Sequence, residues 1–256
     1  MANYHQPPLP FIHHITLNVH DPKKMTDFYL GLGMKVFQQD ASHTILGTGR
    51  PLLTLKHDQP YPLETIATQG LYHVAYLVPS RAALGSILNH LIKNRYALQG
   101  LSYHGVSEAI YLADPEGNGI EIYADRTRML WPFQGKQLAM ITERMKYQEV
   151  LALATPFEGM TEDTIIGHLH LHVSDLTKAT AHYQSTLNYE LIQYYGDSAA
   201  FLSAGGYHHH LGINTWNGQG IPTKNPNTTG LIGYTIYGTV KPTIHDIAGL
   251  TIQFQS

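Results

Sequence analysis

The sequence predicts an α+β protein built from tandem modules, each with one strand, one helix and three further strands. A repeat carries this prediction, because residues 11–37 and 165–192 share an apolar strand, an aspartate and a helical pattern at an offset of 154 residues. Further copies begin at Gly70 and Gly230, and the last is truncated, since only 27 residues remain. The copies are named module one (residues 11–56), module two (70–123), module three (165–214) and module four (230–256).

Each full module is expected to place a helix after its first strand. The expected helices run from about Pro22 to Leu30, Arg81 to Asn94 and Leu176 to Leu187. Asp21 and Asp175 directly precede the first and third of them, where an N-cap side chain would accept a hydrogen bond from the first turn.

The first strand of module three alternates histidine with aliphatic residues. His168, His170 and His172 share one face, because side chains alternate across a strand. This pattern predicts the polar wall of a cleft, with the apolar face packed against the core. Neighbours on one face of a strand lie about 7 Å apart, so each first strand is expected to supply one metal ligand.

The composition points to metal chemistry and excludes thiol chemistry. The chain has 17 histidines against 16 lysines and arginines combined, a net charge of −3 and no cysteine. There is no block of like charge and no apolar stretch of membrane-spanning length, so we expect no nucleic-acid or membrane partner and a soluble, cytoplasmic protein. Histidine and carboxylate are the ligands to look for.

The segment from Asp114 to Tyr123 predicts a tight turn and a short strand. On this strand Ile120 and Ile122 face one way and Glu121 faces the other. A carboxylate on a buried face needs a cation, a hydrogen-bond partner or water. The alternative is a solvated edge strand, on which Glu121 would have no special role.

With these motifs the chain resembles the vicinal oxygen chelate superfamily (glyoxalase, bleomycin-resistance and extradiol dioxygenase proteins), and in particular bacterial catechol 2,3-dioxygenases. The resemblance covers about residues 9–125 and 165–256. It implies a glyoxalase-like fold in which βαβββ modules pair into cupped mixed β-sheets. We expect one domain over residues 1–125, a helical connector over 126–164 and a second domain over 165–256. The connector is expected to hold a helix from about Gly135 to Leu153.

The resemblance also implies a metal site with one histidine from each of two paired modules and one glutamate. His73 and Glu121 match two of these ligands within module two. The third is His14 if modules one and two pair, and His168 if modules two and three pair. Module four carries Gly233 and Gln253 near the ligand positions, so it is not expected to build a site.

Two motifs favour His168 as the third ligand. The triplet His208-His209-His210 resembles the His-His segment beside the open metal face of extradiol dioxygenases, with His209 as the expected acid–base group. His104 and Tyr111 resemble the pair that contacts the ring hydroxyls in these enzymes. The alternatives are an exposed loop for the triplet and ordinary core for Tyr111. A site in modules two and three also departs from the usual enzymes, which place it in modules three and four.

The resemblance implies extradiol cleavage of a catechol by O₂ at a 2-His-1-carboxylate Fe(II) site, with Mn(II) as the other metal to consider. The substrates would be a small aromatic diol and O₂. A glyoxalase-type isomerase or lyase is the runner-up, although Thr54 and Gly212 stand where its second carboxylate would be. A non-catalytic protein that binds an aromatic ligand or an antibiotic is the third hypothesis, and it requires the three ligands to lie apart. The short module four is expected to leave an open sheet edge covered by another chain in a homo-oligomer.

Overall fold

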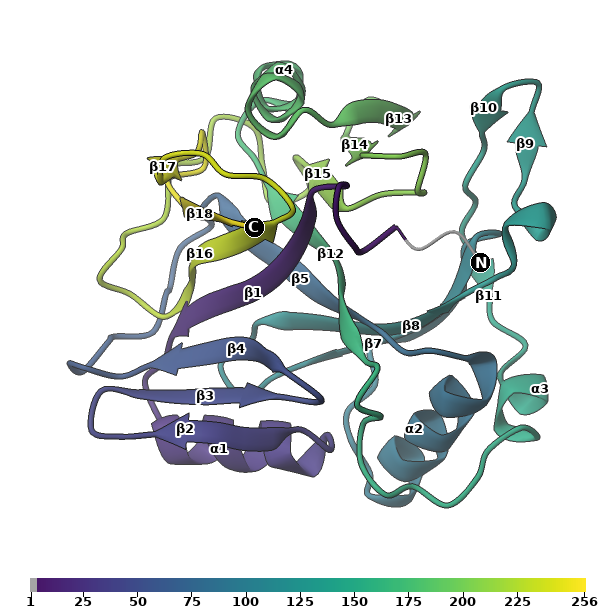
Figure 1. Ribbon diagram of the computed structural model, residues 1–256. Helices are drawn as coiled ribbons and strands as arrows, with labels where there is room; N and C mark the ends of the chain where they lie inside the picture. Colours follow the sequence, from purple (N-terminus) through teal and green to yellow (C-terminus); the bar gives the residue numbers. More distant parts are fainter. Residues whose placement is uncertain (1–3) are drawn as a thin grey trace.

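The computed structural model describes residues 4–256 and confirms the modular plan (Figure 1). Module one comprises β1 (Phe11–Asn18), α1 (Pro22–Gly31), β2 (Lys35–Gln39), β3 (His43–Gly47) and β4 (Pro51–Lys56). Module two comprises β5 (Gly70–Leu77), α2 (Arg81–Lys93), β6 (Gly100–Tyr103), β7 (Ser107–Ala113) and β8 (Gly119–Asp125). Module three comprises β12 (Ile165–His172), α4 (Leu176–Leu187), β13 (Glu190–Tyr195), β14 (Ala199–Ser203) and β15 (Leu211–Asn214). Module four is reduced to β16 (Gly230–Tyr237), β17 (Ile244–His245) and β18 (Thr251–Gln255).

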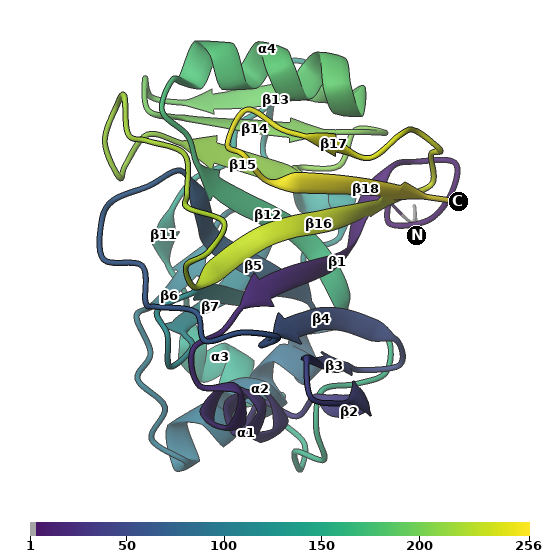
Figure 2. The same cartoon turned by 90° about the vertical axis from the view of Figure 1, so that its left-hand side faces the viewer.

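The modules pair two with three and one with four, so each sheet joins modules from both sides of the connector (Figures 1 and 2). A nine-stranded sheet has the order β11-β6-β7-β8-β5-β12-β15-β14-β13, and a seven-stranded sheet has the order β17-β18-β16-β1-β4-β3-β2. The first strands of paired modules run antiparallel at the centre, β5 with β12 and β1 with β16. The division into domains at residues 1–125 and 165–256 stays a prediction.

The aliphatic faces of the central strands form one continuous core. Ile15 and Leu17 of β1 and Leu169 and Leu171 of β12 are fully buried members of it. His168 and His170, which alternate with Leu169 and Leu171, face the other side of the nine-stranded sheet, as the alternation predicts. Burying one face in this way fixes the strand register, because a slip of one residue would turn the apolar set outward.

The helices begin where the sequence predicts, and the two expected aspartate caps are confirmed. The carboxylate of Asp21 accepts a hydrogen bond from the backbone N–H of Lys24, and Asp175 accepts one from Lys178, each at 3.0 Å. Each cap satisfies a backbone donor that has no partner within the helix.

Buried tyrosine–aspartate hydrogen bonds join neighbouring modules across the sheets. The Tyr29 hydroxyl of α1 donates to Asp114 in the turn before β8 at 3.0 Å, and the Tyr183 hydroxyl of α4 donates to Asp246 before β18 at 2.8 Å. Both tyrosines are fully buried. Asp114 also accepts from the backbone and side chain of Asn118, which closes the predicted turn.

Tyr29→Phe is expected to lower the free energy of unfolding by about 1.5–3 kcal/mol, the usual range for a hydrogen bond to a charged group. Urea unfolding followed by circular dichroism measures this change. Tyr194→Phe is the matched control, because Tyr194 is half-exposed, and it should shift the midpoint little. Equal stability of Tyr29→Phe and the parent would show that Tyr29 does not tie module one to module two.

The connector is not mainly helical, and the helix expected from about Gly135 to Leu153 is wrong over most of its length. The segment contains a short 3-10 helix (Arg128–Leu130), β9 (Phe133–Gln134), β10 (Gln137–Leu138), β11 (Glu143–Arg144) and α3 (Tyr147–Leu151). Gly135 has a left-handed φ of 64° and turns the β9–β10 hairpin. After the hairpin, the connector backbone makes its hydrogen bonds with other segments. β11 pairs with β6, and the backbone of Met140 bonds to the Gln193 side chain of β13.

The outer edges of the seven-stranded sheet are β17 and β2. The two-residue β17 pairs with β18 and shortens the edge that truncated module four leaves. All five residues of β2 are exposed. Coverage of an edge by another chain stays a prediction. Within residues 4–256, none of the helices has the length and apolar character needed to span a membrane.

Candidate metal centre

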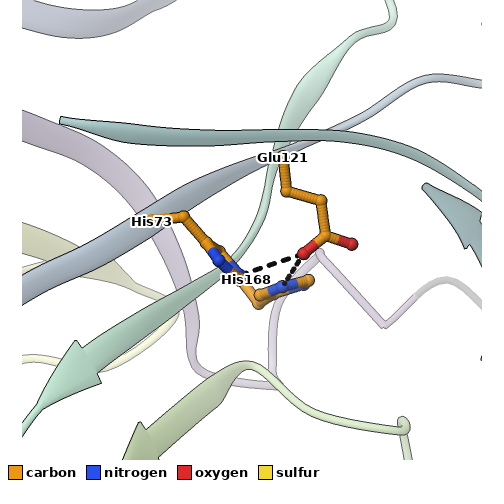
Figure 3. Close-up of side chains that lie close together, drawn as sticks. All are labelled: His73, Glu121 and His168. Atoms are coloured by element: carbon orange, nitrogen blue, oxygen red, sulfur yellow. Dashed lines mark hydrogen bonds and ion pairs between the residues drawn. The ribbon is translucent and has the colours of Figure 1, made fainter. Parts of the chain in front are cut away.

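Three buried side chains from three adjacent strands converge on one point (Figure 3). His73 comes from β5, Glu121 from β8 and His168 from β12. The Nε2 atoms of His73 and His168 lie 2.9 Å and 3.2 Å from the same oxygen, Oε2 of Glu121. All three ligand atoms lie within 4.8 Å of one another, which is the spacing a single ion requires.

The strand register produces this convergence. Ala75 on β5 pairs with Glu121 on the parallel strand β8 and with His168 on the antiparallel strand β12. His73 shares a face with Ala75 because it stands two residues earlier on the same strand. The methyl group of Ala75 leaves the space between its two neighbours open, so the three longer side chains can meet above it.

The protonation states suit a cation. Burial lowers the pKa of His168 to about 4, so its imidazole is neutral near pH 7 and keeps a lone pair. Burial opposes ionisation of Glu121, but the adjacent His168 and His73 outweigh it and hold the pKa of the carboxyl well below its usual value. His73 Nε2 is buried and, although it lies 2.9 Å from Oε2 of Glu121, it makes no hydrogen bond of good geometry. Two imidazoles and one carboxylate, buried and incompletely paired, fit a divalent metal.

The structure brings His168, and not His14, to His73 and Glu121. His14 lies on β1 in the other sheet, where its Nε2 is 2.8 Å from the Thr54 hydroxyl. The pairing of modules two and three therefore brings His168 into the group and leaves His14 outside it.

The corresponding positions of module four hold no ligand. Gly233 of β16 pairs with Thr16 of β1, and His73 of β5 pairs with His170 of β12, so Gly233 occupies the position of His73. Gln253 of β18 pairs with Thr235 of β16, and Glu121 of β8 pairs with Ala75 of β5, so Gln253 occupies the position of Glu121. Within the described part of the chain, the only group of three or more histidine and acidic side chains with metal-ligand spacing is the one in modules two and three.

The three side chains open onto a cavity of about 340 Å³. Its wall includes the predicted residues His104, Tyr111 and His209. The connector residues Met140, Ile141 and Thr142 also line it, and sequence reasoning missed them. No periodic pattern marks these three residues, and their position follows from the pairing of β11 with β6.

His104 and Tyr111 form a hydrogen-bonded pair beside the triad. His104 donates from Nδ1 to the carbonyl of Ile141 at 3.0 Å, so its Nε2 accepts from the Tyr111 hydroxyl at 2.8 Å. Tyr111 pairs with Glu121 across β7 and β8. Burial, reinforced by the charge of Glu121, raises the pKa of Tyr111 well above its usual value, so the phenol keeps its proton.

The histidine triplet before β15 is buried, so the exposed-loop alternative is wrong. Only His209 of the three borders the cavity. Its ring centre lies 4.0 Å from that of His168. His210 instead bonds to the Tyr4 carbonyl through Nε2 and to the Ser203 hydroxyl through Nδ1.

His209 is held by a chain of hydrogen bonds that begins at Asp125. The carboxylate of Asp125 accepts from Nε2 of His208 at 2.9 Å. In the tautomer of His208 whose only N–H faces Asp125, Nδ1 of His208 accepts from Nδ1 of His209 at 2.8 Å. In this arrangement Nδ1 of His209 carries the ring proton, and Nε2 of His209 carries a lone pair. Sequence reasoning missed Asp125, whose position four residues after Glu121 carries no signal of its own.

Comparison with known proteins agrees with the fold. The Glyoxalase/Bleomycin resistance protein/Dioxygenase superfamily profile matches residues 11–122. The chain is 40% identical over 228 residues to the catechol-2,3-dioxygenase of Bacillus subtilis, covering 86% of this chain and 80% of that protein. A solved Bacillus subtilis protein with the provisional name dioxygenase has a TM-score of 0.62 at 17% identity, covering 95% of this chain and 84% of that one. A glyoxalase I variant from Zea mays has a TM-score of 0.59 at 13% identity, covering 96% and 93%.

The chain belongs to the glyoxalase/bleomycin resistance protein/dioxygenase superfamily, as the resemblance predicts. Within this superfamily it is an enzyme similar to the catechol-2,3-dioxygenase of Bacillus subtilis. The glyoxalase-like fold predicted from the repeat is confirmed.

Proposed function

We propose that this protein is an extradiol dioxygenase that cleaves catechol or a substituted catechol with O₂. The observation that carries the proposal is the convergence of His73, Glu121 and His168 on a cavity that also holds His104, Tyr111 and His209. The similarity to the catechol-2,3-dioxygenase of Bacillus subtilis supports the same chemistry.

The triad would hold Fe(II), with Mn(II) as the second candidate. Bound Fe(II) would supply open coordination positions for the two catechol oxygens and for O₂, and would favour the ionised catechol. The protein's own contribution is to orient the diol and to handle its protons. The Tyr111 hydroxyl oxygen can accept a hydrogen bond from a catechol hydroxyl beside the triad, because Tyr111 borders the cavity, and His104 holds that phenol in place through Nε2.

His209 is the group placed to move a proton. His209 borders the cavity and its Nε2 carries a lone pair in this tautomer, so the imidazole can accept a proton from a catechol hydroxyl and later return it to the product. Asp125 and His208 keep His209 in this tautomer and orientation. They act through His209, because neither borders the cavity.

Asp125→Ala is expected to lower kcat about 10-fold while leaving KM for catechol and the iron content near the parent values, because His208 loses its acceptor and the tautomer of His209 is no longer fixed. Steady-state oxygen uptake at several catechol concentrations separates kcat from KM. Asp125→Glu can restore an acceptor and should recover part of kcat. A rise in KM alone would place Asp125 in substrate binding instead.

The competing hypotheses fit the geometry less well. A glyoxalase-type site usually has a second carboxylate, and the ladder positions equivalent to Glu121 hold Thr54 on β4 and Gly212 on β15. A metal-free binding protein required the three ligands to lie apart, whereas their ligand atoms lie within 4.8 Å.

Anaerobic reconstitution with Fe(II), followed by catechol and then air, tests the proposal. We expect oxygen uptake and a yellow ring-opened 2-hydroxymuconate semialdehyde. Metal analysis of protein purified without added metal gives a second readout, with iron or manganese expected. An iron-loaded protein that consumes no oxygen with any of several catechols would overturn the proposal.

A further inference from the structure

His170 is a buried polar side chain in the cavity wall that the proposed chemistry does not use. It is 3% exposed, and its Nε2 is buried without a hydrogen-bond partner. The next histidine on the same face of β12 is satisfied, since Nδ1 of His172 lies 2.8 Å from the side-chain oxygen of Asn214. A buried donor or acceptor left unpaired costs about 1–3 kcal/mol, so the exception at His170 needs a cause.

On the β15 side, His170 faces a glycine and has no side-chain partner there. Its ring packs over Gly212 of β15, where an added Cβ would lie 2.9 Å from the ring. The other neighbours are aromatic, with ring centres 5.1 Å away in Tyr72, 5.2 Å in Trp216 and 5.8 Å in Phe201. This group of His170, Tyr72, Phe201 and Trp216 is the aromatic pocket.

The aromatic pocket adjoins the triad and opens outward. The ring centre of His170 lies 5.1 Å from that of His73. Tyr72 and Trp216 form a rim, because they are 38% and 48% exposed. A catechol held at the triad could therefore direct a ring substituent past His170 towards this rim.

The cavity wall indicates the charge of that substituent. Among the described residues, no lysine or arginine lines the cavity. A carboxylate buried there would have no cationic partner, and burying an unpaired charge costs far more than burying a hydroxyl. An imidazole nitrogen can hydrogen-bond an uncharged hydroxyl or carbonyl group, as donor or as acceptor according to its tautomer.

We propose that the aromatic pocket is a substrate subsite, and that His170 selects catechols with a short, uncharged, hydrogen-bonding substituent on the ring. The inference rests on the proposed function in that it takes a catechol diol to be held at the triad. It adds that the preferred substrate carries a group such as a hydroxymethyl, rather than an alkyl group of the same size or a carboxylate.

Anaerobic calorimetry with the Zn(II)-loaded protein measures this selectivity without oxygen chemistry. The probes are 4-(hydroxymethyl)catechol and 4-ethylcatechol, which have the same shape, together with their 3-substituted counterparts and 3,4-dihydroxyphenylacetate. For at least one ring position we expect the hydroxymethyl compound to bind about 10-fold more tightly than the ethyl compound, the value of one net hydrogen bond of about 1.4 kcal/mol. The carboxylate should bind more weakly than the hydroxymethyl compound.

Variants assign the preference to His170. His170→Leu should remove it, and His170→Gln, which keeps a polar group, should retain part of it. His172→Leu is the matched control on the same strand and should leave the preference intact, because His172 already has a partner outside the cavity. Circular dichroism and zinc content establish that each variant is folded and metal-loaded.

The outcomes separate this inference from the proposed function. Equal affinity of the parent for the hydroxymethyl and ethyl compounds at both positions, tighter binding of the carboxylate, or a preference that survives in His170→Leu would overturn the inference. It would also be overturned if no catechol binds. Selective binding without oxygen uptake by the iron-loaded protein would support the subsite and remove the dioxygenase proposal. Oxygen uptake without selectivity would do the reverse.

Discussion

His168→Ala is expected to lose iron binding and catechol cleavage together, whereas His14→Ala retains both. His168 supplies one of three converging ligand atoms, so its removal should weaken metal affinity by more than about 100-fold, beyond the 10- to 100-fold typical of residues behind a ligand. Metal analysis after anaerobic reconstitution measures iron content, and oxygen uptake with catechol measures cleavage.

His14→Ala is the matched control for this experiment. His14 occupies the same place on its own first strand but contacts Thr54 in the other sheet, so only a modest loss of stability is expected. Iron retained by His168→Ala and lost by His14→Ala would return the centre to modules one and two. Such a result would contradict the strand order of both sheets.

His209→Gln is expected to lower kcat about 100- to 10,000-fold, the range for loss of general acid–base catalysis, with iron content unchanged. Glutamine can hydrogen-bond but cannot take up and release a proton near neutral pH, so substrate binding should suffer less than turnover. Anaerobic binding of catechol to the iron-loaded variant, compared with its turnover in air, separates the two effects.

His210→Gln tests whether the effect belongs to His209 alone. His210 holds Tyr4 and Ser203 and does not border the cavity, so this variant should unfold at lower urea concentration while its folded fraction keeps the parent kcat. An undiminished kcat in His209→Gln would remove His209 from the chemistry and leave the triplet with a structural role.

The sequence predicts those features of the fold and site that depend on residues close together in the chain. Alternation on the strands puts His168 and Glu121 on cavity-facing positions, and Asp21 and Asp175 mark helix starts that the structure reproduces within their first turn. The choice of His168 over His14 depends on which modules pair, and the spacing of ligands alone leaves both possible. The distribution of motifs between modules two and three favoured His168, which the structure brings to the triad.

The parts that sequence reasoning missed depend on contacts between distant segments. Ile141 reaches the site because its carbonyl accepts from His104, and Asp125 contributes through a histidine 83 residues further along the chain. Neither contact leaves a periodic pattern. The helix expected in the connector is wrong for the same reason, because the connector backbone forms hydrogen bonds with β6 and with a side chain of β13 and not within a helix.

The seven-stranded sheet has the same strand pairing around its centre as the sheet that holds the triad, but its backbone leaves no room for a third ligand. His14 and Gln253 stand where His168 and Glu121 stand in the other sheet, so a change of amide to carboxylate would restore a second ligand. The third position is Gly233, where an added Cβ would lie 2.6 Å from the backbone carbonyl oxygen of Thr251. A histidine at position 233 would require β18 to shift before its side chain could bind a metal. Among the described residues, the seven-stranded sheet therefore offers only one histidine at the three positions that form the triad in the other sheet.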